Sequence, residues 1–245
     1  MIRSTMQSRL SITVVVLAAV AVLACGDAAR AQEPPPKPPV ESRSAKHWRE
    51  RLERFRKENA ALPDGRTYAV FVGDSITEGF PLERFFPGKD VLNRGIGADT
   101  VGVAGERGVL RRLDASVFDC RPAVVLIMIG VNDLTGPGAP ASFVDGVGRI
   151  LDAIREWRPE VKVVVQTCLP AGRKYANHAK LNPRIEAYND GLRKLAKERG
   201  LALVDLFALY RDDEGFLEDD LTNDGLHLKK DAYRRWADAV SEFLP

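Results

Sequence analysis

Two kinds of apolar pattern alternate along the chain from residue 68 to its end. Short runs rich in β-branched residues are typical of buried strands, and longer segments with apolar positions three or four residues apart are typical of helices. The expected strands cover residues 68–72, 91–93, 123–129, 161–167 and 202–205. Because strand and helix alternate, we expect one three-layer α/β/α domain with a five-stranded parallel sheet.

The helices expected between and after these strands differ in clarity. Clear stripes predict helices over 142–157, over 183–199 with Gly200 as the stop, and from about residue 230 onward. The last of these is expected to bury Tyr233, Trp236, Ala237, Val240 and Leu244. A helical stretch is also expected up to Leu113, with Leu110 and Leu113 facing the core.

One more helix is expected before the sheet, from residue 44 to residue 60. Trp48, Leu52 and Phe55 form its apolar stripe among many charged residues, so it should pack on the domain without joining the sheet. His47 lies on this helix, where we expect a solvated rather than a catalytic side chain.

The first 31 residues have the features of an export signal. Two arginines precede an apolar run, residues 10–24, that is short for a membrane span, and Ala29-Arg30-Ala31 is typical of a signal-peptidase site. We therefore expect an exported protein, periplasmic or extracellular, that starts at Gln32. Lipidation of Cys25 as a lipoprotein anchor and retention of the run as a membrane anchor are the alternatives.

The chain therefore divides into four expected parts. Residues 1–31 are the expected signal peptide, 32–43 a proline-rich linker, 44–66 an N-terminal helical extension, and 67–245 the α/β domain.

The net charge of the remaining chain narrows the classes of binding partner. Residues 1–31 hold three of the 36 basic and one of the 34 acidic side chains, so the remainder carries 33 of each. No basic field remains that would favour nucleic acid or an anionic membrane surface.

Cys120 precedes one strand and Cys168 follows the next, which places them at opposite ends of the sheet, too far apart for a disulfide.

Polar segments follow the first three expected strands. They are Gly73-Asp74-Ser75, Gly97-Ala98-Asp99-Thr100 and Gly130-Val131-Asn132-Asp133, and a fourth, residues 223–227, precedes the last helix. Because the carboxyl ends of parallel strands meet at one edge of a sheet, we expect these segments to converge there.

The residue types at this edge fit acyl transfer, which needs a nucleophile, a base, a group that orients the base, and donors to an oxyanion. Ser75 can be the nucleophile and His227 the base, with Asp224 three residues earlier to bind its Nδ1–H. The backbone N–H groups near Ser75 and Ala98 and the side chain of Asn132 can form the oxyanion hole. Their neighbours Asp74, Gly97 and Asp99 are expected to support the site or contact substrate.

Each segment alone has a simpler explanation. Gly-Asp-Ser is a common turn, Gly-x-Asn-Asp could be a turn with an Asx cap, and Asp224 could cap the last helix. The presence of all four at one edge argues against coincidence.

With these segments the chain resembles the SGNH (GDSL) hydrolase family between Tyr68 and Leu244. The residues that carry the resemblance are 73–79, 93–100, 130–133 and 224–227. The resemblance implies a flavodoxin-like sheet in the order 2-1-3-4-5, a Ser75–His227–Asp224 triad, and an oxyanion hole from Ser75 N–H, the second-block N–H and Asn132. It implies no metal or organic cofactor. The chain departs from the family at Ala98, where glycine is usual, and an alanine with positive φ would be strained there.

We therefore expect an exported serine esterase for short acyl esters, acetyl above all. The first two blocks look most like the platelet-activating-factor acetylhydrolase and lysophospholipase/acetylesterase branch, so the expected substrate is a carbohydrate or lysolipid-type ester. An O-acyltransferase with the same triad and a non-catalytic glycan-binding protein are the alternatives. The expected partner is a small-molecule or glycan ester, without nucleic acid or a membrane span, and the oligomeric state stays open.

Overall fold

The computed structural model describes residues 41–245. The expected export signal and all but the last three residues of the expected linker lie outside this part of the chain. Within it, no helix is both long and apolar enough to cross a membrane.

The core of the protein is a parallel five-stranded sheet in the order β2-β1-β3-β4-β5. The strands are β1 Tyr68–Gly73, β2 Val91–Gly95, β3 Pro122–Met128, β4 Lys162–Gln166 and β5 Ala202–Val204. β1 is buried along its whole length, which explains its unbroken apolar run. The expected fold class and strand order are confirmed.

The register of the central strands decides where the following segments begin. Gly73, the last residue of β1, pairs with Gly95 at the end of β2 and with Met128 at the end of β3. These three strands therefore end level with one another, and the segments that follow them start at the same edge of the sheet.

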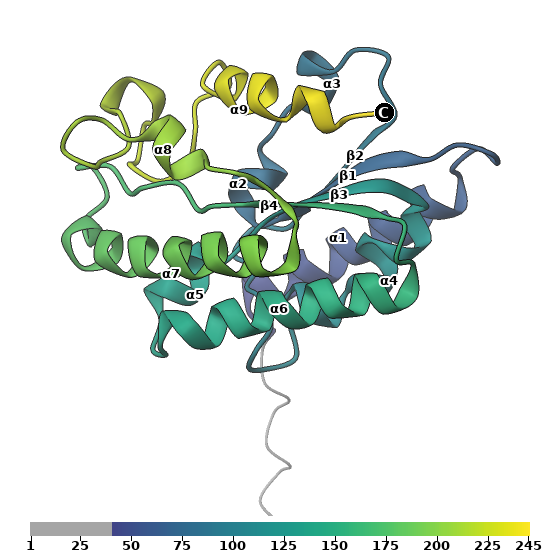
Figure 1. Cartoon of the computed structure of the whole chain (residues 1–245), viewed down its shortest axis with the longest axis horizontal. Coiled ribbons are helices and arrows are strands. Elements are labelled where there is room, and N and C mark those ends of the chain that lie inside the picture. Colours follow the sequence, from purple (N-terminus) through teal and green to yellow (C-terminus); the bar gives the residue numbers. More distant parts are fainter. Residues whose placement is uncertain (1–40) are drawn as a thin grey trace, which may run out of the picture. The chain divides into compact units, whose positions relative to one another are not determined.

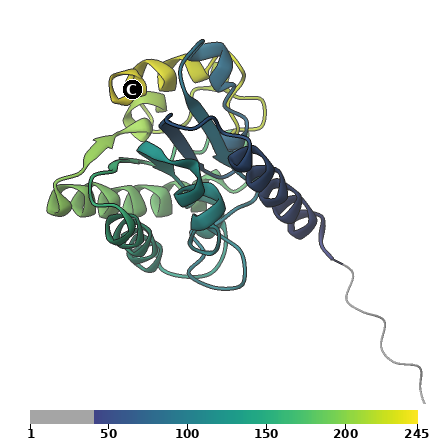
Figure 2. The same cartoon turned by 90° about the vertical axis from the view of Figure 1, so that its right-hand side faces the viewer.

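Helices cover both faces of the sheet. Figure 1 shows α6 (Pro140–Trp157) and α7 (His178–Arg199) on one side and α9 (Tyr233–Val240) on the other, and the quarter turn of Figure 2 shows the same layers. The shorter helices are α2 Ser75–Glu78, α3 Leu82–Phe85, α4 Leu113–Ser116, α5 Val131–Thr135 and α8 Leu206–Tyr210.

The ends of the long helices agree only in part with the sequence pattern. Gly200 ends α7 in the left-handed conformation, as expected, but α7 begins at His178 and contains Pro183. The side chain of Asn182 accepts a bond from Ala171 N and donates one to Ala171 O, which ties this first part of α7 to the preceding loop. In α9 the four expected residues up to Val240 are buried, whereas Leu244 lies beyond the helix and is only partly buried.

The expected helix up to Leu113 is wrong. A loop follows β2, and only two 3-10 turns (Val109–Arg111 and Phe118–Cys120) and the one-turn α4 lie between it and β3. Gly102, Gly105 and Gly108 have φ of 89°, 78° and 122°, which are incompatible with a continuous helix. Leu113 is buried as expected, and Leu110 is partly buried.

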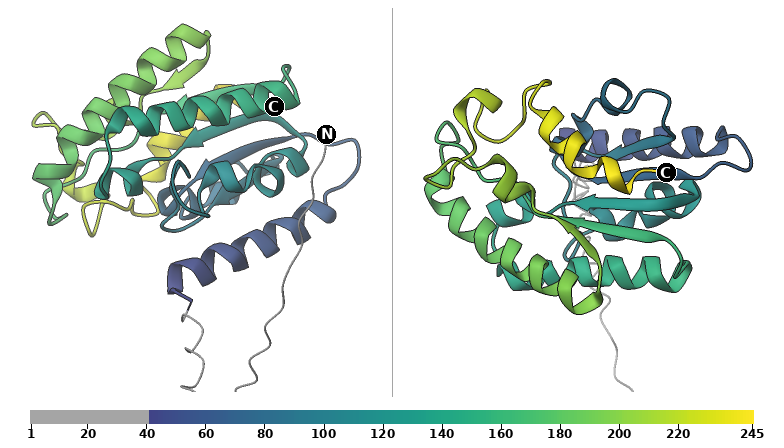
Figure 3. Two further views of the ribbon diagram at one scale, coloured as in Figure 1. Left: turned by 90° about the horizontal axis from the view of Figure 1, so that it is seen from below. Right: turned by 45° about the horizontal axis from the view of Figure 1, so that its top comes forward.

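Helix α1 (Arg43–Ala60) agrees with the expected N-terminal helix. Leu52 and Phe55 are buried against Ile96 and Ala115, with Trp48 partly buried beside them. Seen from below (Figure 3, left), α1 lies on the same side of the sheet as α6, at the far edge from α7. The two cysteines of the described residues, Cys120 and Cys168, are buried free thiols, as expected.

Candidate active site

A tight turn places Ser75 at the carboxyl end of β1. A side chain at Gly73 would bring its Cβ within 2.3 Å of Met128 O, so only glycine fits this crossing. Asp74 then caps α2, because its carboxylate accepts a hydrogen bond of 3.0 Å from Ile76 N. Ser75 is the first residue of α2. The Gly-Asp-Ser sequence therefore ends a buried strand and starts a helix with a hydroxyl at its first position.

The structure brings Ser75, His227 and Asp224 into one chain of hydrogen-bond contacts. Ser75 Oγ lies 2.8 Å from His227 Nε2, although 152 positions separate the two residues. His227 Nδ1 lies 2.7 Å from Asp224 Oδ2. With the proton on Nδ1, the imidazole donates to the carboxylate and its Nε2 can accept the Ser75 hydroxyl proton.

The loop that carries His227 and Asp224 is fixed by its own hydrogen bonds. Asp224 Oδ1 accepts bonds from Leu226 N and His227 N at 2.9 and 2.8 Å. Thr222 Oγ1 donates to His227 O at 2.7 Å and accepts from Gly225 N at 2.9 Å. Asp224 does not cap the last helix, which begins only at Tyr233.

The same contacts set the charge of Asp224. Burial acts to raise its pKa, but the hydrogen bonds from the His227 ring and from the backbone N–H groups of His227 and Leu226 outweigh it. They hold the pKa of Asp224 well below its usual range. The carboxylate therefore stays ionised beside the imidazole at neutral pH, where it can stabilise an imidazolium.

The second loop contains the residue that departs from the family pattern. Ala98 has φ of 59°, so the left-handed conformation anticipated for this position is present and is held by an alanine. Asn132, in the first turn of α5, donates from Nδ2 to Asp99 O at 2.8 Å, one residue after Ala98. This hydrogen bond joins the second and third polar segments directly. The Asn132 side chain therefore does not form the local Asx cap considered above.

The side chains next to these residues in the sequence are mostly buried. Asp74 is fully buried, its Oδ2 has no hydrogen-bond partner among the described residues, and burial raises its pKa to about 7. Burial likewise raises the pKa of Asp133 to about 6, although Asp133 Oδ2 accepts a bond from Val101 N at 3.0 Å. Asp74 and Asp99 are at most 2% exposed, so their side chains are not open to solvent.

Arg112 is a structural residue of this region that the sequence pattern did not indicate. Its guanidinium is buried and donates to Asp99 Oδ2 (2.7 Å), Arg94 O (2.8 Å) and Gly73 O (2.9 Å). It therefore ties the second loop to the ends of β1 and β2. Ser116 Oγ, four positions away, also accepts from it at 2.7 Å, but the three partners at the sheet edge lie 13, 18 and 39 positions away, and no local pattern indicates them.

His47 lies on α1 with 43% of its side chain exposed, in keeping with the expected solvated helix residue. It also has a contact that the sequence pattern did not indicate, because its Nε2 lies 3.0 Å from Glu78 Oε2. The same Glu78 oxygen accepts the N–H of Gly97. Trp48, on the same helix, donates from Nε1 to Asp99 Oδ1 at 3.1 Å. The N-terminal helix therefore contacts the second loop on both sides of Ala98: directly at Asp99 through Trp48, and at Gly97 through Glu78.

A cavity of about 320 Å³ opens beside α5, the helix that carries Asn132. It is lined by Leu134, Thr135, Tyr175, Asn177, Lys180 and Arg184. Within residues 41–245 no three His, Cys, Asp or Glu side chains are grouped as a metal ion would require.

The family assignment comes from comparison with known proteins. Residues 71–235, about two thirds of the chain, match the GDSL-like Lipase/Acylhydrolase family. Platelet-activating factor acetylhydrolase IB subunit alpha2 of Homo sapiens is 27% identical over 184 residues, which cover 71% of this chain and 75% of the relative.

Solved structures show the same fold. A GDSL-like lipase from Bacteroides thetaiotaomicron has a TM-score of 0.68 at 23% identity and covers 78% of this chain and 96% of that chain. An acetyl xylan esterase has a TM-score of 0.59 at 22% identity, covering 72% and 98%. Fold and sequence together place the protein among ester-hydrolysing enzymes. It belongs to the GDSL-like Lipase/Acylhydrolase family.

Proposed function

We propose that this enzyme is a serine esterase that removes short acyl groups, acetyl above all, through an acyl-Ser75 intermediate. The observation that carries the proposal is the continuous contact from Ser75 Oγ to His227 Nε2 (2.8 Å) and from His227 Nδ1 to Asp224 (2.7 Å). A hydroxyl, an imidazole and an ionised carboxylate in this order are what nucleophilic acyl transfer requires.

The first half of the reaction forms the acyl-enzyme. His227 Nε2 takes the Ser75 proton as Oγ attacks the ester carbonyl, and Asp224 stabilises the imidazolium that results. The N–H groups of Ser75 and Ala98 and the second N–H of the Asn132 amide stabilise the oxyanion. The intermediate then collapses, and the imidazolium gives its proton to the departing alcohol.

The second half uses water in place of the alcohol. His227 deprotonates a water molecule that attacks the acyl carbonyl, and the same donors stabilise the second oxyanion. Collapse returns the proton from His227 to Ser75 Oγ and releases the carboxylic acid. Apart from this water molecule, each step uses only groups of this chain and of the substrate.

The substrate proposal rests on the cavity beside α5, whose lining includes none of the triad residues, and on the names of two relatives. The cavity beside α5 presents the side chains of Thr135, Tyr175, Asn177 and Lys180, which can bind hydroxyl groups, and a tyrosine ring can stack on a sugar. Relatives in sequence and in fold are named as an acetylhydrolase and an acetyl xylan esterase. The two names favour an acetyl group, and the polar lining of the cavity together with the second name favours a carbohydrate as the alcohol.

The test is hydrolysis of p-nitrophenyl acetate, butyrate and octanoate by residues 32–245, beside Ser75→Ala. We expect turnover that falls with chain length and that is lost in the variant, which must keep its circular dichroism spectrum. Equal rates from the two proteins would contradict the proposal. Adding a sugar acceptor extends the assay, because an acylated sugar among the products would make the enzyme an O-acyltransferase with the same triad.

Export to the periplasm or the medium is part of the same proposal, and it rests on residues 1–31 of the sequence. Cell fractionation and N-terminal sequencing test it. A mature protein that starts at Gln32 supports cleavage after Ala31, a lipid on Cys25 makes the enzyme a lipoprotein, and an intact N-terminus in the cytoplasm contradicts export.

A further inference from the structure

Helix α1 lies outside the residues that match the family, 71–235, and yet it contacts the loop that carries Ala98. We infer that α1 is a working part of the active site, in which Trp48 and His47 are positioning residues that hold the Ala98 N–H toward the oxyanion. This inference rests on the proposed function, because it assigns the Ala98 N–H the role of an oxyanion donor.

The first contact fixes the residue after Ala98. Asp99 Oδ1 accepts the Trp48 indole N–H at 3.1 Å, and Asp99 Oδ2 accepts Arg112 Nε at 2.7 Å. Its backbone carbonyl accepts the Asn132 amide at 2.8 Å. Three different parts of the chain therefore hold the three oxygens of Asp99, and α1 holds one of them.

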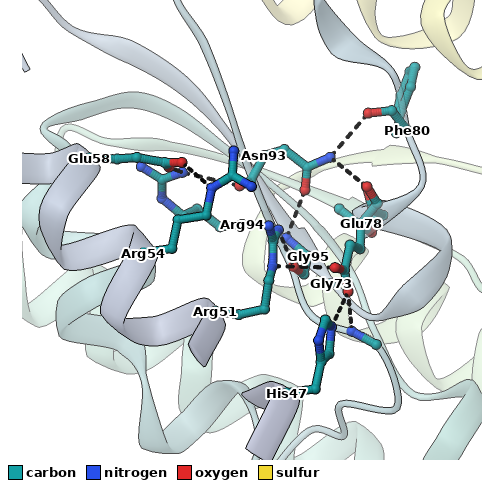
Figure 4. A network of polar contacts seen from close by, with 12 residues as sticks. His47, Arg51, Arg54, Glu58, Gly73, Glu78, Phe80, Asn93, Arg94 and Gly95 are labelled. Atoms are coloured by element: carbon teal, nitrogen blue, oxygen red, sulfur yellow. Dashed lines mark hydrogen bonds and ion pairs between the residues drawn. The ribbon is translucent and has the colours of Figure 1, made fainter. Parts of the chain in front are cut away.

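The second contact fixes the residue before Ala98. Glu78 Oε2 accepts the Gly97 N–H, and His47 Nε2 lies 3.0 Å from the same oxygen. Arg51, one turn further along α1, donates to Gly95 O at 2.8 Å and forms an ion pair with Glu78. Figure 4 shows His47 and Arg51 pointing from α1 toward Glu78 and Gly95.

Apolar side chains of α1 also pack against the loop that carries Ala98. Ile96, the first residue after β2, is fully buried in a small cluster with Leu52 and Phe55 of α1. The guanidinium carbons of Arg51 and Arg94 lie 4.8 and 4.7 Å from the centre of the Phe55 ring. The position of α1 is therefore coupled to the position of the loop.

The loop needs to be held because Ala98 is strained. At φ of 59°, an alanine is strained relative to the right-handed region, because its Cβ comes too close to the carbonyl oxygen that follows. Strained residues persist only where their surroundings over-determine them. If Ala98 relaxed, the peptide plane before it would rotate and its N–H would leave the oxyanion position. Bonds on Gly97 and Asp99, the two neighbours, oppose that rotation.

Trp48→Phe tests the inference, because it keeps an aromatic ring on α1 and removes the indole N–H. We expect kcat on p-nitrophenyl acetate to fall about tenfold, with KM changed less than twofold, since the lost interaction acts on the transition state only. Trp157→Phe is the matched control. Trp157 stacks on Phe118 at 4.8 Å, away from this loop, and its replacement should leave kcat unchanged.

His47 gives an independent arm that does not disturb the apolar cluster. His47→Ala should lower kcat severalfold, and His47→Gln, which keeps a donor for Glu78, should restore most of it. This arm also decides the question if Trp48→Phe fails to fold, as judged by circular dichroism.

The outcomes separate the inference from the proposed function. If Ser75→Ala abolishes turnover while Trp48→Phe and His47→Ala keep the wild-type kcat, the inference is wrong and the esterase proposal stands. A raised KM with unchanged kcat would also overturn it, because α1 would then act on substrate binding. If Ser75→Ala retains turnover, both proposals are wrong.

Discussion

Ala98 shows how a single residue can differ from its family pattern without changing the backbone it adopts. Alanine occupies the left-handed conformation that glycine takes without strain, with φ of 59°. The donor at this position is a backbone N–H, which alanine also has. The cost of the substitution therefore falls on the loop conformation, which contacts from Asn132, Arg112 and α1 maintain.

Asn132 is the side chain whose role a single substitution tests best. One N–H of its amide donates to Asp99 O, which leaves the other for the oxyanion. We expect Asn132→Ala to lower kcat by about 10²–10³, as for other single oxyanion donors. Steady-state kinetics on p-nitrophenyl acetate provide the measurement, and an unchanged kcat would remove Asn132 from the site.

Asp74 leads to a prediction about pH and stability. Its pKa in the folded protein is about 7, above the ordinary value of 3.8, so the folded state binds this proton more tightly than the unfolded state. Ionisation of Asp74 therefore lowers the free energy of unfolding of the wild type as pH rises from about 4 to 7, and Asp74→Asn, which cannot ionise at this position, lacks that contribution. We expect the free energy of unfolding of the variant, relative to that of the wild type, to rise across this window by on the order of 1–4 kcal/mol.

Urea unfolding of both proteins at pH 4, 5, 6, 7 and 8 measures this difference. The free energies of unfolding should diverge up to about pH 7 and then run parallel. Curves that stay parallel from pH 4 onward would show that Asp74 ionises normally. The cost of placing an amide at this buried site is the same at every pH and does not affect the comparison.

At the scale of elements, the segment between β2 and β3 is the main departure from the expected pattern. Apolar positions at helical spacing suggested a helix, but glycines at 102, 105 and 108 with positive φ fold the segment into a loop. Within that loop the backbone at Gly102 packs closely against the backbone at Gly108. This loop brings Arg112 under Asp99 and thereby connects the fold to the site.

Gly108→Ala tests this crossing. A Cβ at residue 108 would lie 2.2 Å from Gly102 Cα, in addition to the strain of φ at 122°. We expect a loss of more than about 2 kcal/mol in the free energy of unfolding. Gly105→Ala is the matched control, since its φ is 78° but nothing lies within 4 Å of the added Cβ. It should cost about 1 kcal/mol, and equal losses in the two variants would contradict the close approach.

At the scale of the whole molecule, the prediction concerns which part of the chain is sufficient. Residues 41–245 contain the sheet, its covering helices, α1 and all the residues proposed for the site. We expect a chain of residues 41–245 to match residues 32–245 in melting temperature and kcat. Removal of α1 as well, leaving 66–245, should lower both, because Ile96 and Ala115 lose their cover and Asp99 loses Trp48.

Thermal unfolding and ester hydrolysis on the three chains provide the comparison. If residues 66–245 kept the stability and kcat of the longer chains, α1 would be an appendage and not a part of the enzyme. If residues 41–245 fell short, the segment before residue 41 would contribute to folding.

The features determined by sequence alone are those with a local or periodic cause. Alternating strand and helix patterns predicted the α/β sheet, because burial on both faces requires unbroken apolar runs such as 123–129. The short polar motifs indicated which residues meet, because parallel strands end at one edge. The contacts that only the tertiary structure decided join residues distant in sequence, as Arg112 with Gly73 and Trp48 with Asp99 do. Such contacts depend on how close folding brings two unrelated segments, and no local periodicity records that distance.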